Sequence, residues 1–182
     1  MGKVFDEIDS ALTAWIAEQR IFFVSTAPLA GDGLINCSPK AHDTFRILGP
    51  TTVAYLDLTG SGVETIAHLK ENGRIVIMFC AFAGGPRIVR FQGTGEALEK
   101  GTPAYQSLIP EFDELPGTRG IIRVQLNRIS DSCGYSVPLY DYQEDRDVLT
   151  KWATQKGQKG VLEYQQGHNL KSLDGLPGLT SS

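Results

Sequence analysis

The turn at residues 60–62, Gly-Ser-Gly, separates a strand-like segment from a helix-like segment, and such a turn can bind phosphate. The first backbone N–H groups of a helix have no partner inside the helix and lie at the positive end of its dipole. The hydroxyls of Ser61 and Thr65 would add donors. Capping is the alternative, because Ser61 and Glu64 have the spacing of a capping box. The two interpretations are compatible, since a capped helix start still presents N–H groups.

A lysine and a loop that contains a thiol are the other candidate functional groups. Lys40 follows Ser38 at the end of a predicted strand, where it can reach the same phosphate, although a single lysine at a strand end is usually a solvated charge. The loop at residues 132–138 combines the thiol of Cys133 with the ring of Tyr135, and a well-packed turn is its simpler interpretation.

Other kinds of site have little support. The three histidines lack the spacing of metal ligands, so we expect no metal. The three cysteines are widely spaced and odd in number, which predicts buried thiols rather than a disulfide framework or a zinc site. The Gly-Thr-Gly at residues 93–95 lacks the third glycine and the following helix of a dinucleotide-binding fingerprint.

The elements that must position these groups are mostly strands. Apolar residues from Val4 to Ile16 recur at helical spacing and predict an opening amphipathic helix. Strands are predicted at residues 21–26, 34–38, 44–48, 52–58, 74–83, 87–98 and 118–129. Further helices are predicted at residues 63–72, closed by Asn72 and Gly73, and at residues 144–156, with a helix or loop at 102–112. Because short turns link most strands, the pattern favours an antiparallel barrel over a parallel βαβ sheet.

The length and composition predict one globular domain. The chain has 182 residues, of which 41% are hydrophobic and 21% are charged. We expect a barrel domain with flanking helices over residues 1–156. Residues 157–182 are expected to form a C-terminal extension that packs on the barrel or on a dimer partner, although by composition alone this polar, glycine-rich segment would be a loose tail.

The charge and hydropathy argue against nucleic-acid and membrane partners. The net charge of −4 gives no general attraction to nucleic acid or to anionic membranes. The longest strongly apolar segment, residues 75–83, is about half as long as a membrane-spanning helix. Acidic residues occur early in the chain, where a secretory signal would place its apolar stretch. We therefore expect a soluble, cytoplasmic protein.

Taken in order, several segments resemble the FMN-binding core of the pyridoxamine 5′-phosphate oxidase-like family. They are residues 36–40, 54–69, 72–74, 78–79, 86–88 and 93. Residues 132–135 and 169–179 resemble a subgroup distinct from the true pyridoxamine-phosphate oxidases. The resemblance thus covers most of the chain, from Ile21 to Leu179.

The resemblance implies a mainly β (α+β) fold: an FMN-binding split β-barrel of six to seven antiparallel strands with a few peripheral helices. It also implies a homodimer with flavin at the interface. The cofactor-binding candidates are Ser38, Lys40, Ser61 and Thr65 for the phosphate, Leu56, Asp57 and Thr59 beside the flavin ring and ribityl chain, and Arg87 near the flavin. The candidates for the substrate pocket are Cys133 and Tyr135.

Three departures argue against oxidation of vitamin B6. The true oxidases carry a basic pair after the serine of the phosphate turn, but here that region, residues 62–65, has none. Their arginine before the matching lysine has no counterpart at Ile35, and their C-terminal tryptophan and arginine motif is missing. Lys40, Ser61 and the helix dipole must then neutralise most of the phosphate charge, with help from Arg87 or Arg90.

The implied function is that of an FMN-dependent oxidoreductase acting on an unidentified small molecule, by hydride transfer at flavin N5 with NAD(P)H or an organic substrate. No general acid or base is nominated. One alternative is a non-catalytic protein that binds flavin, haem or another planar ligand. Another is an enzyme that uses the deazaflavin F420 in place of FMN.

Overall fold

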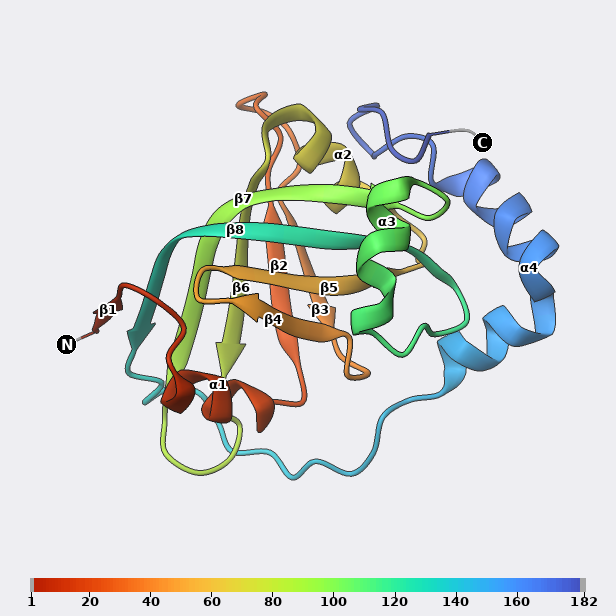
Figure 1. The fold of residues 1–182 in the computed structure, drawn as a ribbon. Coiled ribbons are helices and arrows are strands. Elements are labelled where there is room, and N and C mark those ends of the chain that lie inside the picture. Colours follow the sequence, from red (N-terminus) through yellow and green to blue (C-terminus); the bar gives the residue numbers. More distant parts are fainter. Residues whose placement is uncertain (1, 181–182) are drawn as a thin grey trace.

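The computed structural model describes residues 2–180, which form one antiparallel sheet curled into an open barrel (Figure 1). The strands are β1 (Val4–Phe5), β2 (Phe22–Thr26), β3 (Asn36–Lys40), β4 (Phe45–Gly49), β5 (Thr52–Leu58), β6 (Arg74–Cys80), β7 (Ile88–Glu99) and β8 (Thr118–Ser132). Seven of them pair in the order β3-β2-β6-β7-β8-β5-β4, and β1 pairs with the end of β8. The mainly β split-barrel class is confirmed, and within the described residues the two-residue β1 brings the number of strands to eight, against six or seven predicted.

Helices lie at the ends and sides of the barrel. They are α1 (Ser10–Ala17), α2 (Glu64–Asn72), α3 (Pro103–Leu108) with the 3-10 turn η1 (Ile109–Glu111), and α4 (Val148–His168). Figure 1 shows α1 and α2 at opposite ends of the barrel and α4 to one side. After β8, the chain runs along the α1 end before it reaches α4. None of the described helices is long and apolar enough to cross a membrane.

Strand β5 contributes to two apolar clusters because successive side chains of a strand point to opposite faces. Val53 and Tyr55 belong to the larger cluster, in which Phe22, Phe79 and other rings pack edge to face. Ala54 and Leu56 belong to a smaller cluster beside α3. This alternation places Asp57 on the Tyr55 side, where the carboxylate is fully buried and must find partners.

The structure differs from the predicted start of the first helix and from two interpretations that spacing or composition alone suggested. The first helix begins at Ser10 rather than near Val4, because Asp9 caps it by accepting the N–H of Leu12 at 2.7 Å. The capping box at Ser61 does not form: α2 has Val63 as its N-cap, without a side-chain cap. The segment after residue 156 is not a loose tail, because α4 begins at Val148, kinks at Gly157 and continues to His168. The predicted end of α2 is confirmed, since Gly73 adopts the left-handed conformation at its C-cap.

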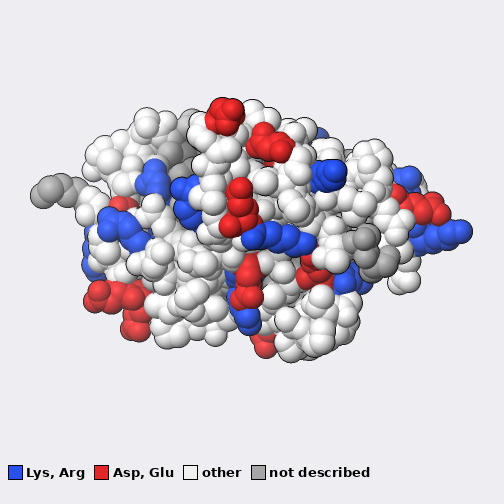
Figure 2. Space-filling view, turned by 90° about the horizontal axis from the view of Figure 1, so that it is seen from above, with Lys and Arg blue, Asp and Glu red and all other residues white. Residues whose placement is uncertain are grey.

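Charged side chains of both signs are interspersed on the face shown in Figure 2. Exposed ion pairs of the described chain include Arg123 with Glu96 at 2.6 Å and Lys100 with Glu114 at 2.5 Å. This face therefore has no broad patch of one sign of charge.

Candidate functional site

A cavity of about 1110 Å³ is lined both by residues that follow α1 and by residues of the turn before α2. Its lining comes from parts of residues 18–23, 39–44, 56–60, 82–84 and 140–149. Most of these segments connect or end strands, so the sheet holds their backbone while their side chains face the cavity. The walls combine apolar groups, such as Leu56 and Phe82, with charged groups of both signs. The cations are Lys40, Arg20 and Arg146, and the carboxylates are Glu18, Asp141, Glu144 and Asp145.

The segment after residue 139 forms one side of this cavity. Tyr140 donates its backbone N–H to the carbonyl of Phe82 at 2.9 Å, and the two rings pack with centroids 5.5 Å apart. Further along, the guanidinium of Arg20 lies 5.3 Å from the ring centre of Tyr142. These contacts fasten the segment to the barrel and reduce the exposure of the cavity to water.

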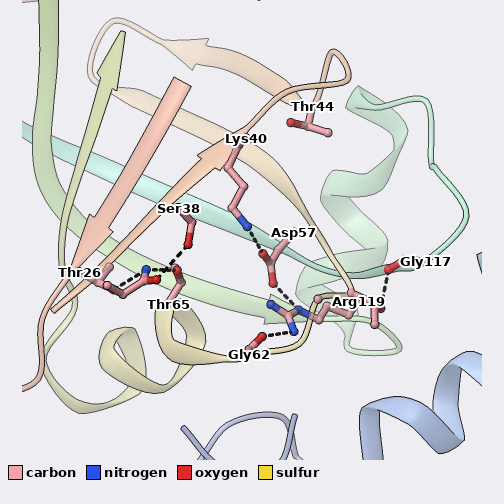
Figure 3. Close-up of polar contacts among 12 residues, drawn as sticks. Thr26, Ser38, Lys40, Thr44, Asp57, Gly62, Thr65, Gly117 and Arg119 are labelled. Atoms are coloured by element: carbon pink, nitrogen blue, oxygen red, sulfur yellow. Dashed lines mark hydrogen bonds and ion pairs between the residues drawn. The ribbon is translucent and has the colours of Figure 1, made fainter. Parts of the chain in front are cut away.

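Lys40 belongs to an ion cluster with the buried residues Asp57 and Arg119 (Figure 3). The Nζ of Lys40 lies 3.2 Å from one carboxylate oxygen of Asp57, and the Nε of Arg119 lies 2.6 Å from the other. The side chain of Asp57 is completely buried and that of Arg119 is 5% exposed, whereas that of Lys40 is 20% exposed and reaches the cavity. Asp57 therefore holds one cation inside the fold and one at the cavity.

This cluster carries more positive than negative charge. Burial opposes ionisation of Asp57, but the charges of Arg119 and Lys40 and their hydrogen bonds outweigh it, so that the pKa of Asp57 is lowered. Asp57 is therefore a carboxylate at neutral pH. Two cations then face one carboxylate, which leaves one positive charge in excess, and the cation that reaches the cavity is Lys40.

A chain of neutral hydrogen bonds links β2, β3 and α2 beside the ion cluster. Ser38 donates its hydroxyl to Asn36 at 2.9 Å, and Asn36 donates its amide to Thr65 at 3.1 Å and to Thr26 at 3.4 Å. Thr26 in turn bonds the Nδ1 of the buried His68 at 2.9 Å. The side chains of Ser38 and Thr65 thus lie in one network and fix the start of α2 against the sheet (Figure 3).

The structure divides the predicted site residues into three groups. Lys40, Leu56 and Thr59 line the cavity, and Asp57 lies behind Lys40. Ser38 and Thr65 meet in the neutral network, while Ser61 is exposed in the turn before α2. Arg87, Cys133 and Tyr135 lie together elsewhere.

That third group lines a second hollow of about 540 Å³, next to the first. Both hollows have parts of residues 18–19 and 83–84 in their walls. Arg87 binds Asp131 through its Nε and Nη2, at 3.2 and 3.0 Å, and Asp131 also accepts the backbone N–H of Lys3 at 2.7 Å. The ring of Tyr135 is largely exposed.

The thiols differ from the predicted pattern of burial. Cys80 is buried, but Cys37 and Cys133 are exposed, so the prediction of buried thiols is wrong for two of the three. Cys37 lies on β3, which pairs with β2 at one edge of the sheet, and Cys133 follows the last residue of β8. Within residues 2–180, no group of three potential ligands could hold a metal ion.

Arg119 is the principal site residue that the sequence did not reveal. It is the second residue of β8, in the buried part of that strand, and it binds Asp57 across 62 positions in the chain. A charged residue just before an apolar strand segment, here residues 121–122, indicates that a buried partner exists, but it does not say which carboxylate that partner is. Asn169 was also missed: it is fully buried, and its Oδ1 accepts from Arg119 at 2.9 Å.

The fold and the cavity define a class of protein: open antiparallel barrels with a cation-bearing pocket beside a strand-to-helix turn. Similar folds are known, among them HupZ of Group A Streptococcus, with a TM-score of 0.52 and 23% identity over 67% of this chain and 91% of that one. A putative pyridoxamine 5′-phosphate oxidase of Lactobacillus delbrueckii also has a TM-score of 0.52, with 14% identity over 70% and 98% of the two chains. At these identities the likeness shows the fold alone.

The sequence comparisons identify the family. The family model for pyridoxamine 5′-phosphate oxidase matches residues 8–133. A curated relative from Aspergillus flavus, the pyridoxamine 5′-phosphate oxidase family protein ustO, is 40% identical over all of this chain and 80% of its own. The chain belongs to the pyridoxamine 5′-phosphate oxidase family.

Proposed function

We propose that the protein binds FMN in the cavity beside Lys40 and acts as an oxidoreductase on a small molecule. The observation that carries this proposal is the unbalanced charge of the Lys40, Asp57 and Arg119 cluster. A positive charge at a cavity wall favours an anionic ligand, and the phosphate of FMN is such a group. Membership in the family supports the choice of a flavin.

The dimensions of the cavity suit this ligand. Ligand pockets in proteins commonly measure about 300–1,000 Å³, and this cavity, at about 1110 Å³, is slightly larger than that. Leu56, Phe82 and Tyr140 offer apolar surface for a planar ring system, while Lys40 offers charge for a phosphate. The wall thus has both kinds of group that FMN requires.

The residues of the chain would bind, orient and shield the cofactor. Arg119 keeps Asp57 ionised and in place, and Asp57 positions the ammonium group of Lys40. The segment fastened by Tyr140 and Tyr142 limits the entry of water. Bound FMN would supply hydride-transfer chemistry, and the protein would supply binding and electrostatics.

The remaining nominated residues keep their proposed roles, to be tested one by one. Ser38, Ser61 and Thr65 are proposed phosphate contacts, of which Ser61 has the most exposed side chain. Arg87 is a proposed flavin contact, and Cys133 and Tyr135 are proposed substrate contacts from the adjoining hollow. We also propose a homodimer that completes the flavin site at its interface, which a mass measurement in solution tests.

The decisive experiment is a flavin titration of the purified protein. We expect flavin absorbance near one FMN per chain, and bleaching when NADH or NADPH is added. FMN that binds but is reduced by neither donor would favour the non-catalytic alternative. Protein that binds F420 or haem but not FMN would contradict the choice of cofactor.

Two substitutions test the phosphate contacts directly. Lys40→Ala and Ser61→Ala should each weaken FMN binding by about 1–3 kcal/mol if a charge-assisted bond is lost. Unchanged affinity in both variants would remove the phosphate assignment.

A further inference from the structure

Asn169 follows α4 and is fully buried beside the turn that borders the cavity. Its Oδ1 accepts from the Nη1 of Arg119 at 2.9 Å, and its Nδ2 donates to the carbonyl of Gly60 at 3.1 Å. Its backbone N–H bonds the carbonyl of Gln165, and its carbonyl accepts the N–H of Leu179, at 2.7 and 2.8 Å. The side-chain oxygen and nitrogen of Asn169 therefore bond residues of the site, whereas its backbone N–H and carbonyl bond residues of the C-terminal segment.

Arg119 depends on Asn169 for part of its coordination. Its Nε binds Asp57 at 2.6 Å, and its Nη1 is shared between the carbonyl of Gly62 and the amide oxygen of Asn169, at 2.8 and 2.9 Å. A buried guanidinium that loses an acceptor keeps an unsatisfied donor, so its position becomes less favourable. Asn169 thus stabilises the orientation in which Arg119 faces Asp57.

Gln165 fixes the same turn at a second point. Its Nε2 donates to the hydroxyl of Thr59 at 2.7 Å, and that hydroxyl donates to the carbonyl of Gly117 at 2.7 Å. Thr59 lines the cavity, as does Gly60, which Asn169 holds. The end of α4 therefore clamps the strand-to-helix turn from outside the barrel.

The segment after Asn169 is docked tightly enough to maintain this clamp. A side chain at Gly178 would collide with the carbonyl of Asn169 and with Val63, the N-cap of α2, which explains glycine at that position. Thr180 donates its backbone N–H to Glu99 at 2.7 Å, and Glu99 also binds Lys70 at 2.6 Å. Burial alone would raise the pKa of Glu99. Its bonds to Lys70 and to the N–H and hydroxyl of Thr180 have the larger effect, so the pKa is lowered.

We propose that Asn169 is a positioning residue for the anion site at Lys40, because it holds Arg119 on Asp57. With Arg119 in place, Asp57 is neutralised from inside the fold and the charge of Lys40 remains available to a ligand. When Arg119 is displaced, Lys40 becomes the main counter-ion of Asp57 and is lost to the ligand. This inference rests on the proposed binding of FMN at Lys40, and it concerns the phosphate rather than the flavin ring.

The test compares FMN with riboflavin, which has the same ring system but no phosphate. Asn169→Asp adds a second carboxylate beside Arg119, so that two cations face two carboxylates and no charge is in excess. We expect the preference for FMN over riboflavin to fall about 10- to 100-fold in this variant. Asn169→Ala should lower the preference in the same direction.

Two variants on α4 serve as controls. Gln166→Ala removes an exposed side chain next to Gln165 and should leave both affinities unchanged. Gln165→Ala releases Thr59 without touching the ion cluster, so it should weaken both flavins equally. A folded Asn169→Asp protein that keeps the wild-type preference, or that weakens both ligands alike, would overturn the inference.

A measurement on the wild-type protein covers the case in which the Asn169 variants do not fold. Coupling between two sites is reciprocal, so FMN should slow backbone hydrogen exchange in residues 165–180 as well as in residues 59–62. Slowing confined to residues 59–62 would overturn the inference. Wild-type protein that binds neither flavin would contradict the proposed function itself, whereas FMN binding without these effects would contradict the role of Asn169 alone.

Discussion

A cluster of three charges and a single ion pair lie beside adjoining hollows of this barrel, and they differ in burial and in charge balance. Asp57 is completely buried and faces two cations, Lys40 and Arg119. Asp131 is 19% exposed and has one charged partner, Arg87. The first cluster therefore retains a positive charge for a ligand, whereas the second is neutral. The number of arginines and lysines near a cavity therefore matters less than how many of them are already neutralised.

The largest difference should appear when each carboxylate is removed. Asp57→Ala leaves Arg119 buried without its counter-ion, which should cost about 3–5 kcal/mol of unfolding free energy. Asp131→Ala breaks a partly exposed pair and should cost about 1 kcal/mol or less. Urea unfolding of both variants measures the difference, and equal losses would show that burial does not separate the two pairs.

Protonation of Asp57 in acid should lower the unfolding free energy less than the Asp57→Ala substitution does, since a protonated carboxyl still accepts hydrogen bonds. The pKa of Asp57 is lower in the folded than in the unfolded chain, so its stabilising contribution is complete above the ordinary value of 3.8. It is lost as the pH falls below that value and through the folded pKa. Unfolding free energy should then fall less steeply with acid in Asp57→Asn than in the wild type, if that variant folds. Parallel profiles would contradict a lowered pKa, because Glu99 and Glu114 titrate in both proteins.

The charge of Lys40 should affect the ligand more than the fold. Lys40→Met keeps most of the apolar stem and removes the charge, and it should weaken FMN binding by about 1–3 kcal/mol. The unfolding free energy should change less than in Asp57→Ala, since Arg119 still neutralises Asp57. Fluorescence titration measures the affinity, with Lys159→Met on the exposed face of α4 as a control for overall charge. Equal weakening by both variants would point to a non-specific effect.

The smallest effect is expected at Arg87. Because Asp131 already neutralises it, Arg87→Ala should change FMN affinity about twofold or less. A loss as large as that of Lys40→Met would instead place Arg87 at the flavin, as the family resemblance implies. The same titration decides between these outcomes.

Much of the barrel could be predicted from local sequence. Apolar runs ended by Gly and Pro locate the strands, and Asn72 with Gly73 marks the end of α2, because these patterns depend on neighbouring residues only. The helical continuation of α4 beyond Gly157 could not be predicted, because its composition is polar and its end is held by contacts with Thr59 and Arg119. Tertiary contacts outweigh propensity there.

Several residues of the site could be predicted from the sequence, but the contacts between them could not. Lys40 and Asp57 were both nominated, yet nothing in the sequence indicates that they bind each other or that Arg119 completes the cluster. The capping-box spacing at Ser61 and Glu64 predicted a local contact, but the Glu64 carboxylate accepts the N–H of Leu173 at 3.2 Å instead. Partners more than a hundred positions away cannot be read from spacing.

The position of Asn169 has a consequence for the order of events during synthesis. Every strand of the barrel leaves the ribosome before Asn169 does, so Arg119 is already enclosed by strands while one of its acceptors is still being made. The nascent chain therefore passes through a stage in which the barrel can form but the charge cluster is incomplete. A protease that removes the segment after α4 would return the protein to that stage, with its sheet intact and its anion site loosened.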